Sequence, residues 1–517
     1  MRYFLEIKEK IIKIIGKIDK KALFILFLIL ILGGFLRTYK LGNQSFIGDE
    51  YYGLNASYGY YKSGEWKDWN FNKNELTTRV YKRSQAYYWQ VAQVFKILDA
   101  TEATSRLVSV FWGLFGIVSV FVITFLITKN YYISALSSFL LAVSISSLIY
   151  DRKLRMYSMF TPVFLWFSYS LFWLIESHYK GGYLFVRKIS KKIGFNLAFL
   201  PVVIFLGILS LNVHILTVNI IPVVFVYFTI MGLISFRKNR KIFNKYSYLL
   251  LVGVLAVFIA TKTQEIQNAL SFFSWNINNW GYFKIITLDY KGIMLPAVFF
   301  VIGAYYLIKK NNLKSGVWTV SSYLVILFLA IMVWRREPGN QYILFTQSFK
   351  IIIVSSGIFY VSKTISEKVF VGSRKWFFGL VVLFLILILN IPFFYSKDSF
   401  YGEIKSWNYS NYREIFQYFL NNRNENSVLI IRDVPSNTYY LKNTNTNLIN
   451  YNEKEGNELT LEMILDAQNK YNEVWVIYSR DFYIKREALN YVKEEFKKVE
   501  NSYANKQLEI WRWKKIK

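Results

Sequence analysis

The sequence of 517 residues contains no cysteine and only two histidines, His178 and His214. Without thiols the chain forms no disulfide, ligates no iron–sulfur cluster through cysteine and uses no thiol nucleophile. Two histidines alone also exclude the usual zinc sites. We therefore expect chemistry that uses neither a metal nor a cofactor.

Two phosphate-binding signatures are missing as well, namely G-x-x-x-x-G-K-[ST] and G-x-G-x-x-G. Loops of these kinds hold nucleotide phosphates on their backbone N–H groups. There is also no D-x-D pattern of the kind that holds a metal-bound sugar nucleotide. An enzyme of this composition that works outside the cell needs an activated substrate supplied by the membrane.

Apolar residues are abundant: the chain is 54% hydrophobic and 19% aromatic, with a mean hydropathy of +0.25. Runs near the roughly 20 residues that cross a bilayer recur through the first three quarters. The sequence predicts a polytopic α-helical membrane protein with about eleven spans. They are expected near 22–36, 107–128, 131–150, 158–175, 195–211, 213–234, 246–260, 292–308, 317–334, 343–361 and 376–394. The first run lacks a small-residue cleavage site, so we expect a retained span there.

The net charge of +30 belongs to the membrane region, because only 19 of the 63 basic residues but 17 of the 33 acidic ones lie at Ser396 or beyond. The basic excess gathers in short connections between spans, which the positive-inside rule places in the cytoplasm. This location argues against nucleic acid as a partner. It predicts a cell-membrane protein with a cytoplasmic N-terminus and an extracytoplasmic tail.

We expect two domains, a transmembrane domain at 1–395 and an extracytoplasmic α/β domain at 396–517. Alternating helical periodicity and short apolar runs indicate the α/β tail. The first outer loop, 37–106, is too long for a connector, and its segments Tyr51–Ser63 and Ser84–Leu98 show helical spacing. A further interfacial element is predicted at Phe272–Phe283, which is rich in aromatic residues.

The most informative feature is the adjacent pair Asp49 and Glu50, which follows Gly48 in that first outer loop. Carboxylates near the lipid boundary are costly unless they are used. On a helix the two side chains point about 100° apart, so one can face a reaction centre while the other organises its neighbours. An exposed acidic helix cap is the plainer alternative.

Basic residues form two further candidate patches at predicted outer boundaries. Arg152 and Arg155 lie three apart in the segment Tyr150–Tyr157, and their guanidinium forks match phosphate oxygens. Ordinary flanking of spans by charged side chains is the alternative. Arg335 and Arg336 form the second patch. His214 lies near an outer junction, where it either touches substrate or is a packed, hydrogen-bonded histidine.

These residues resemble a known group of enzymes. Arg37 with Asp49–Glu50, the stretch 103–113, and Tyr150–Tyr157 with its Arg-x-x-Arg-x-Tyr pattern are similar to the GT-C glycosyltransferases. More narrowly, they resemble the dolichyl-phosphate-mannose protein mannosyltransferase superfamily, which includes the aminoarabinose transferases. The resemblance spans most of the chain.

The resemblance implies a polyprenyl-phosphate sugar donor, with Asp49 as the catalytic carboxylate of the first outer loop and Glu50 as its partner. Arg152, Arg155 and Tyr157 match positions near the donor phosphate, and Arg336 is a further candidate for that contact. Possible substrate contacts are Arg37, Asp151, His214 and Arg335. Asp151 departs from the family pattern, where a small polar residue is expected, and Lys82–Gln85 replaces a proline-rich signature.

We therefore predict hexosyl or pentosyl transfer from a polyprenyl-phosphate donor to a hydroxyl of a protein, lipid or glycan acceptor. The reaction is expected to invert the anomeric centre, with Asp49 as the base. Membrane lipids are expected as further partners of the protein. A lipid-linked glycan ligase or polymerase is one alternative. A non-catalytic glycolipid transporter is another, although it should carry more charges within its spans.

Overall fold

The computed structural model describes two compact units. Its described residues are 20–179, 181, 183–260, 279–335, 337–396, 399, 401, 411–432, 435–442, 444–452, 456–478, 483–499 and 508–515. The helical unit comprises Met1–Thr38, Arg83–Tyr87 and Ser109–Ile391. The mixed unit comprises Tyr39–Lys82, Tyr88–Val108 and Pro392–Lys517. The first outer loop and the tail thus belong mostly to one unit, and the predicted boundary at 395 stays a prediction.

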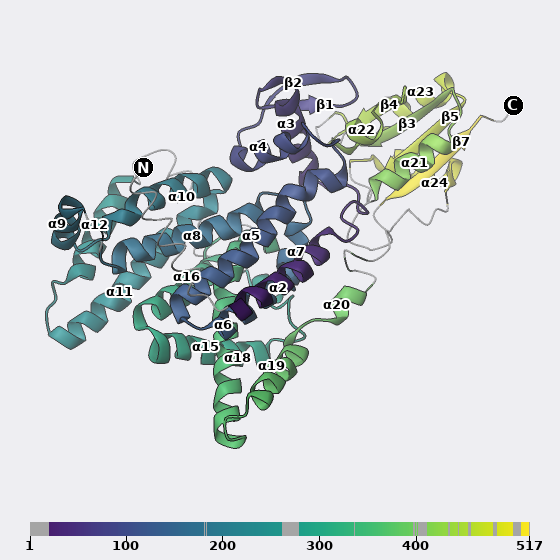
Figure 1. Ribbon diagram of the computed structural model, residues 1–517. Coiled ribbons are helices and arrows are strands. Elements are labelled where there is room, and N and C mark those ends of the chain that lie inside the picture. Colours follow the sequence, from purple (N-terminus) through teal and green to yellow (C-terminus); the bar gives the residue numbers. More distant parts are fainter. Residues whose placement is uncertain are drawn as a thin grey trace. The chain divides into compact units, whose positions relative to one another are not determined.

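Each of the eleven predicted spans coincides with helix, nearly all of it in the helical unit (Figure 1). The principal helices are α2 (Lys20–Thr38), α5 (Glu102–Thr128), α6 (Tyr131–Ala142), α7 (Ile145–Asp151), α8 (Tyr157–Glu176), α9 (Leu184–Ile193), α10 (Leu200–Val213), α11 (Ile220–Asn239), α12 (Lys245–Ala260), α14 (Gly281–Ile286), α15 (Met294–Tyr305), α16 (Leu313–Met332), α17 (Asn340–Ile343), α18 (Gln347–Val369) and α19 (Arg374–Ile388).

Six helices among the described residues are long and apolar enough to cross a membrane, or up to eight if each bent pair is one span. The chain is a multi-pass membrane protein. The shorter helices α12, α15 and α19 match three of the other predicted spans, so the count of eleven stays a prediction. Residues 261–278, which include most of the predicted interfacial element, lie outside the described part.

The span predicted at 131–150 is broken into α6 and α7, which meet at 57°. Ser144 explains the break, because its side chain accepts a hydrogen bond from the Ser147 N–H and so caps a new helix. The first N–H groups of α7 then have no partner in a preceding helical turn. One of them, on Ser146, donates to the carboxylate of Asp289 at 2.9 Å.

Helices α15 and α18 pack so closely that the backbone of one contacts the backbone of the other. A Cβ atom added to Gly303 would lie 1.8 Å from the carbonyl oxygen of Ile353, and one added to Gly357 would lie 1.9 Å from that of Phe299. Small residues at helix crossings allow such approach in membranes, where packing rather than water exclusion drives association. These two glycines therefore fix the crossing point.

The first outer loop forms local structure in the mixed unit. The predicted helices are present as α3 (Asp49–Ser63) and α4 (Gln85–Val94), the latter of which begins in the helical unit. Between them lies an antiparallel hairpin of β1 (Lys67–Asn70) and β2 (Glu75–Val80), which the sequence did not reveal. Helix α3 packs closely against it, since Gly59 leaves no room for a side chain against the carbonyl of Lys67.

The tail is an α/β domain, as predicted (Figure 1). Its sheet has the order β4-β3-β5-β7-β6. Strands β4, β3 and β5 pair in parallel, and β7 pairs antiparallel with both β5 and β6. The strands are β3 (Ser427–Arg432), β4 (Asn447–Tyr451), β5 (Glu473–Tyr478), β6 (Lys497–Lys498) and β7 (Glu509–Lys514). The helices are α20 (Pro392–Tyr395), α21 (Tyr412–Asn422), α22 (Pro435–Tyr440), α23 (Leu461–Lys470) and α24 (Arg486–Glu495).

Both faces of this sheet are covered, because successive side chains of the buried strands point to opposite faces. Val428 and Ile430 pack with α23 and α24. Leu429 and Ile431 pack with α21 on the other face. The resulting two-sided core explains why β3 and β5 are continuous apolar runs.

Candidate active site

The acidic pair begins helix α3. Gly48, which precedes it, has φ +36°, a conformation that side chains disfavour. Asp49 is exposed, whereas Glu50 is 1% exposed. Both lie in the first turn, where the helix dipole stabilises negative charge. The two neighbours therefore occupy different environments.

Glu50 is held by a buried arginine that the sequence reading gave no role. Arg106 donates from Nε and Nη2 to the two carboxylate oxygens of Glu50, each at 2.9 Å. The same guanidinium donates to the backbone carbonyls of Leu41, Gln44 and Ser45. This bidentate pair, which is the strong geometry for such contacts, fixes the segment that leads into Asp49.

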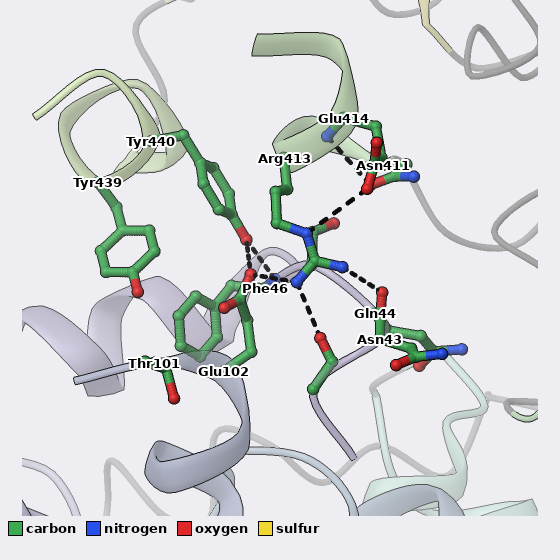
Figure 2. A network of polar contacts seen from close by, with 12 residues as sticks. Asn43, Gln44, Phe46, Thr101, Glu102, Asn411, Arg413, Glu414, Tyr439 and Tyr440 are labelled. Carbon is green, nitrogen blue, oxygen red and sulfur yellow. Dashed lines mark hydrogen bonds and ion pairs between the residues drawn. The ribbon is translucent and has the colours of Figure 1, made fainter. Parts of the chain in front are cut away.

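Residues of the tail also bind this segment and the neighbouring Glu102 (Figure 2). Tyr440 of α22 accepts a hydrogen bond from the Phe46 N–H at 2.9 Å and donates to Glu102 at 2.8 Å. Arg413 of α21 donates to Glu102 at 3.1 Å and to the carbonyl of Gly42 at 2.8 Å. Burial raises the pKa of Tyr440, and the Glu102 carboxylate raises it further, so the phenol stays a donor.

Three predicted residues meet in the helical unit. Arg37, fully buried, donates from Nε to Asp151 at 2.9 Å and to the carbonyls of Gly33 and Ala142. Arg152 donates to the carbonyls of Leu36 and Arg37, which end α2. Cationic donors are favourable at this helix end. The cluster therefore joins the end of α2 to the end of α7.

This cluster explains why Asp151 departs from the family pattern, because its carboxylate neutralises the buried guanidinium of Arg37.

Asp151→Asn is expected to destabilise the protein by about 1–3 kcal/mol, because Arg37 loses its counter-charge but keeps its carbonyl partners. Thermal unfolding in detergent measures the change. The exposed control Glu367→Gln, which loses a pair with Lys363 at 3.7 Å, should change stability by about 0.5 kcal/mol or less. Equal stabilities of the Asp151→Asn variant and this control would contradict the role.

Arg155 and Tyr157 lie beside one another just after this cluster. The guanidinium carbon of Arg155 is 5.4 Å from the centre of the Tyr157 ring, which itself lies 5.4 Å from the His214 ring. Arg155 is less buried than Arg152. Of these two predicted phosphate contacts, Arg155 is therefore the more accessible.

His214 is packed and hydrogen-bonded. Its Nδ1 accepts a hydrogen bond from the Leu216 N–H at 3.1 Å, and its ring lies 5.3 Å from that of Phe160. Arg335 is exposed, and Arg336 lies outside the described residues. Asp49 and Glu50 belong to the mixed unit, while Arg37, Asp151, Arg152, Arg155, Tyr157 and His214 belong to the helical unit.

A second buried charge cluster was missed by the sequence reading. Lys350, inside the apolar helix α18, donates to Asp289 at 3.1 Å and to the carbonyl of Ile286. Gln347 donates to the same carboxylate at 2.6 Å. Burial alone would raise the pKa of Asp289, but Lys350 and the hydrogen bonds outweigh it and lower that pKa. The lysine within an apolar run is the sequence feature that could have revealed this cluster.

Known proteins resemble this chain in structure. No family model matches it, and no curated protein matches it by sequence. ArnT from Cupriavidus metallidurans, solved with bound undecaprenyl phosphate, superposes with a TM-score of 0.54 at 11% identity, covering 95% of this chain and 97% of ArnT. The archaeal oligosaccharyltransferase AglB from Archaeoglobus fulgidus, in complex with an inhibitory peptide and a dolichol-phosphate, gives 0.57 at 9% identity, covering 88% of this chain and 69% of AglB.

Both of these proteins are members of the GT-C superfamily. This chain has the GT-C fold. The finding confirms the resemblance in fold to the GT-C glycosyltransferases, and it confirms a polytopic helical protein with a sheet-containing C-terminal domain. At identities of 9% and 11%, the likeness concerns the backbone fold.

Proposed function

We propose that this protein is a membrane glycosyltransferase that moves a hexosyl or pentosyl group from a polyprenyl-phosphate donor to an acceptor hydroxyl. The observation that carries the proposal is the near full-length GT-C likeness to ArnT, a protein solved with undecaprenyl phosphate bound. The reaction takes place on the outer face, with the N-terminus cytoplasmic and the α/β tail extracytoplasmic. The basic loops between the spans support this orientation.

Asp49 is the general base of the proposed reaction. Its exposure and its place in the first turn of α3 leave the carboxylate accessible to an acceptor proton. Glu50 does not share this role, because its carboxylate is occupied by Arg106 and acts as a positioning group. The acceptor oxygen attacks the anomeric carbon as its proton passes to Asp49, and the bond to the polyprenyl phosphate breaks with inversion.

The leaving phosphate gains negative charge that cations must stabilise. Arg155, next to Tyr157, is the candidate for direct contact, with Arg336 as a second one. Arg152 is occupied with the last carbonyls of α2, so we assign it the positioning of the segment that carries Arg155.

The test is transfer by the purified chain in proteoliposomes. A polyprenyl-monophosphate hexose or pentose, radiolabelled in the sugar, is supplied with a cell-envelope extract as acceptor. We expect label to move to the extract and polyprenyl phosphate to be released in equal amount. Mass spectrometry of surface glycans after gene deletion then identifies the sugar and acceptor.

The competing function is a lipid-linked glycan ligase, which the likeness to the oligosaccharyltransferase AglB favours. A polyprenyl-diphosphate oligosaccharide in the same assay distinguishes the two functions. Transfer from the diphosphate donor alone would replace the proposed function by a ligase. Flipping of either lipid without transfer would indicate a transporter instead.

A further inference from the structure

The mixed unit contains a cavity of about 380 Å³, which is within the range of about 300–1,000 Å³ typical of small-molecule sites. Its walls come from three distant parts of the sequence: helix α3 with the hairpin and its turn, the residues before α5, and the end of α22 with the residues just after it. All of its lining residues lie within the mixed unit and within the described part of the chain. None of them has a role in the proposed reaction.

Four aromatic rings form the floor of this cavity: Tyr58, Trp69, Phe71 and Tyr439. Neighbouring rings contact one another in edge-to-face or tilted arrangements. The ring of Phe71 lies 5.2 Å from that of Tyr439 at 89°, and the ring of Tyr58 lies 4.7 Å from Phe71 and 5.7 Å from Trp69. The hydroxyl of Tyr439 also donates to the carbonyl of Ala100 at 2.6 Å. Figure 2 shows Tyr439 together with Thr101, the residue that follows Ala100. The four rings of the floor are therefore held in place by one another and by this hydrogen bond.

Exposed polar side chains surround this floor, namely Asn74, Asp99, Thr101 and Lys442. The Lys442 ammonium lies 4.5 Å from the centre of the Tyr439 ring. One carboxylate and one ammonium give the rim both charge signs and no net charge. Together with an amide and a hydroxyl, they provide donors and acceptors on several sides of an apolar base.

We propose that this cavity binds a neutral saccharide unit. A sugar ring presents C–H groups on its faces and hydroxyls on its edge, so it matches an aromatic floor and a polar rim at the same time. A lipid chain would leave the rim groups without partners, and an organic cation would meet the ammonium of Lys442. The assignment of this saccharide as part of the acceptor rests on the proposed function, whereas its binding does not.

Direct binding to the full chain in detergent tests the inference without any transfer. Saturation-transfer NMR is carried out with maltose and mannobiose as neutral disaccharides and with a glucuronic-acid disaccharide as the charged comparison. We expect signal transfer to a neutral disaccharide from the wild type. Trp69→Ala should lower its affinity by about tenfold or more, the loss typical of an aromatic anchor.

Asp99→Asn, an exposed and nearly isosteric change, should weaken binding several-fold with an unaltered unfolding temperature. Trp66→Ala is the matched control, because Trp66 belongs to the same loop but stacks on Tyr60 at 4.4 Å, outside the cavity. It should bind as the wild type does. No saccharide signal for the wild type, binding of only the charged disaccharide, or equal binding by the Trp69, Asp99 and Trp66 variants would each overturn the inference. Binding without transfer would instead contradict the proposed function alone.

Discussion

Replacement of Asp49 by Asn is expected to lower the rate of sugar transfer by about 10²–10⁴-fold, the usual contribution of a positioned base. The amide keeps the size of the carboxylate but cannot accept the acceptor's proton. Because Asp49 is exposed, the unfolding temperature should change little. Initial rates of label transfer in proteoliposomes, at saturating donor, measure the effect.

Glu65→Gln is the matched control for this change. Glu65 is an exposed acid in the same loop, where it pairs with Lys67 at 2.6 Å, and its loss should leave the transfer rate within a factor of about two. A rate for Asp49→Asn equal to that of this control would remove Asp49 from the reaction. Restored activity in Asp49→Glu would support proton transfer over a purely structural role.

Replacement of Arg106 by Met is expected to destabilise the mixed unit by about 3–5 kcal/mol, because it leaves the Glu50 carboxylate buried without its cation. Three backbone carbonyls also lose their donor. The segment before Asp49 should loosen, so transfer should fall along with stability. Thermal unfolding in detergent and hydrogen exchange of residues 41–50 measure the two effects.

The double variant Glu50→Leu with Arg106→Met separates charge burial from packing. Replacing both members of a buried pair by apolar residues often restores stability, so this protein should be more stable than Arg106→Met alone while transfer stays low. Lys62→Met, an exposed change on the same helix α3, controls for loss of a cation. A double variant less stable than the single one would show that Glu50 and Arg106 do not act as a pair.

Local pattern predicted the secondary structure where a segment's own residues decide it. Long apolar runs gave helices at all eleven expected places, because a helix satisfies its backbone within the segment. The apolar runs of β3 and β5 were equally clear. The hairpin β1–β2 and strand β4 (Asn447–Tyr451) were not, since β4 is polar and is a strand only through its pairing with β3.

The candidate site was less accessible to sequence reasoning. The pattern identified Asp49 and Glu50 and suggested that they have different roles, but it could not choose the partner of Glu50, which lies 56 residues away at Arg106. The same holds for Arg37 and Asp151, separated by 114 residues. Which charges pair over such distances depends on the folded chain, so the sequence alone does not predict these pairs.

The contacts of Tyr440 and Arg413 with the first outer loop have a consequence for engineering and inheritance. A chimera that takes its C-terminal domain from one GT-C protein and residues 39–108 from another would place foreign side chains opposite Glu102 and the Phe46 amide. In such hybrids the hydrogen bonds between the C-terminal domain and the first outer loop should be lost unless both segments are exchanged together. The two stretches, far apart in the sequence, should therefore be exchanged as one module.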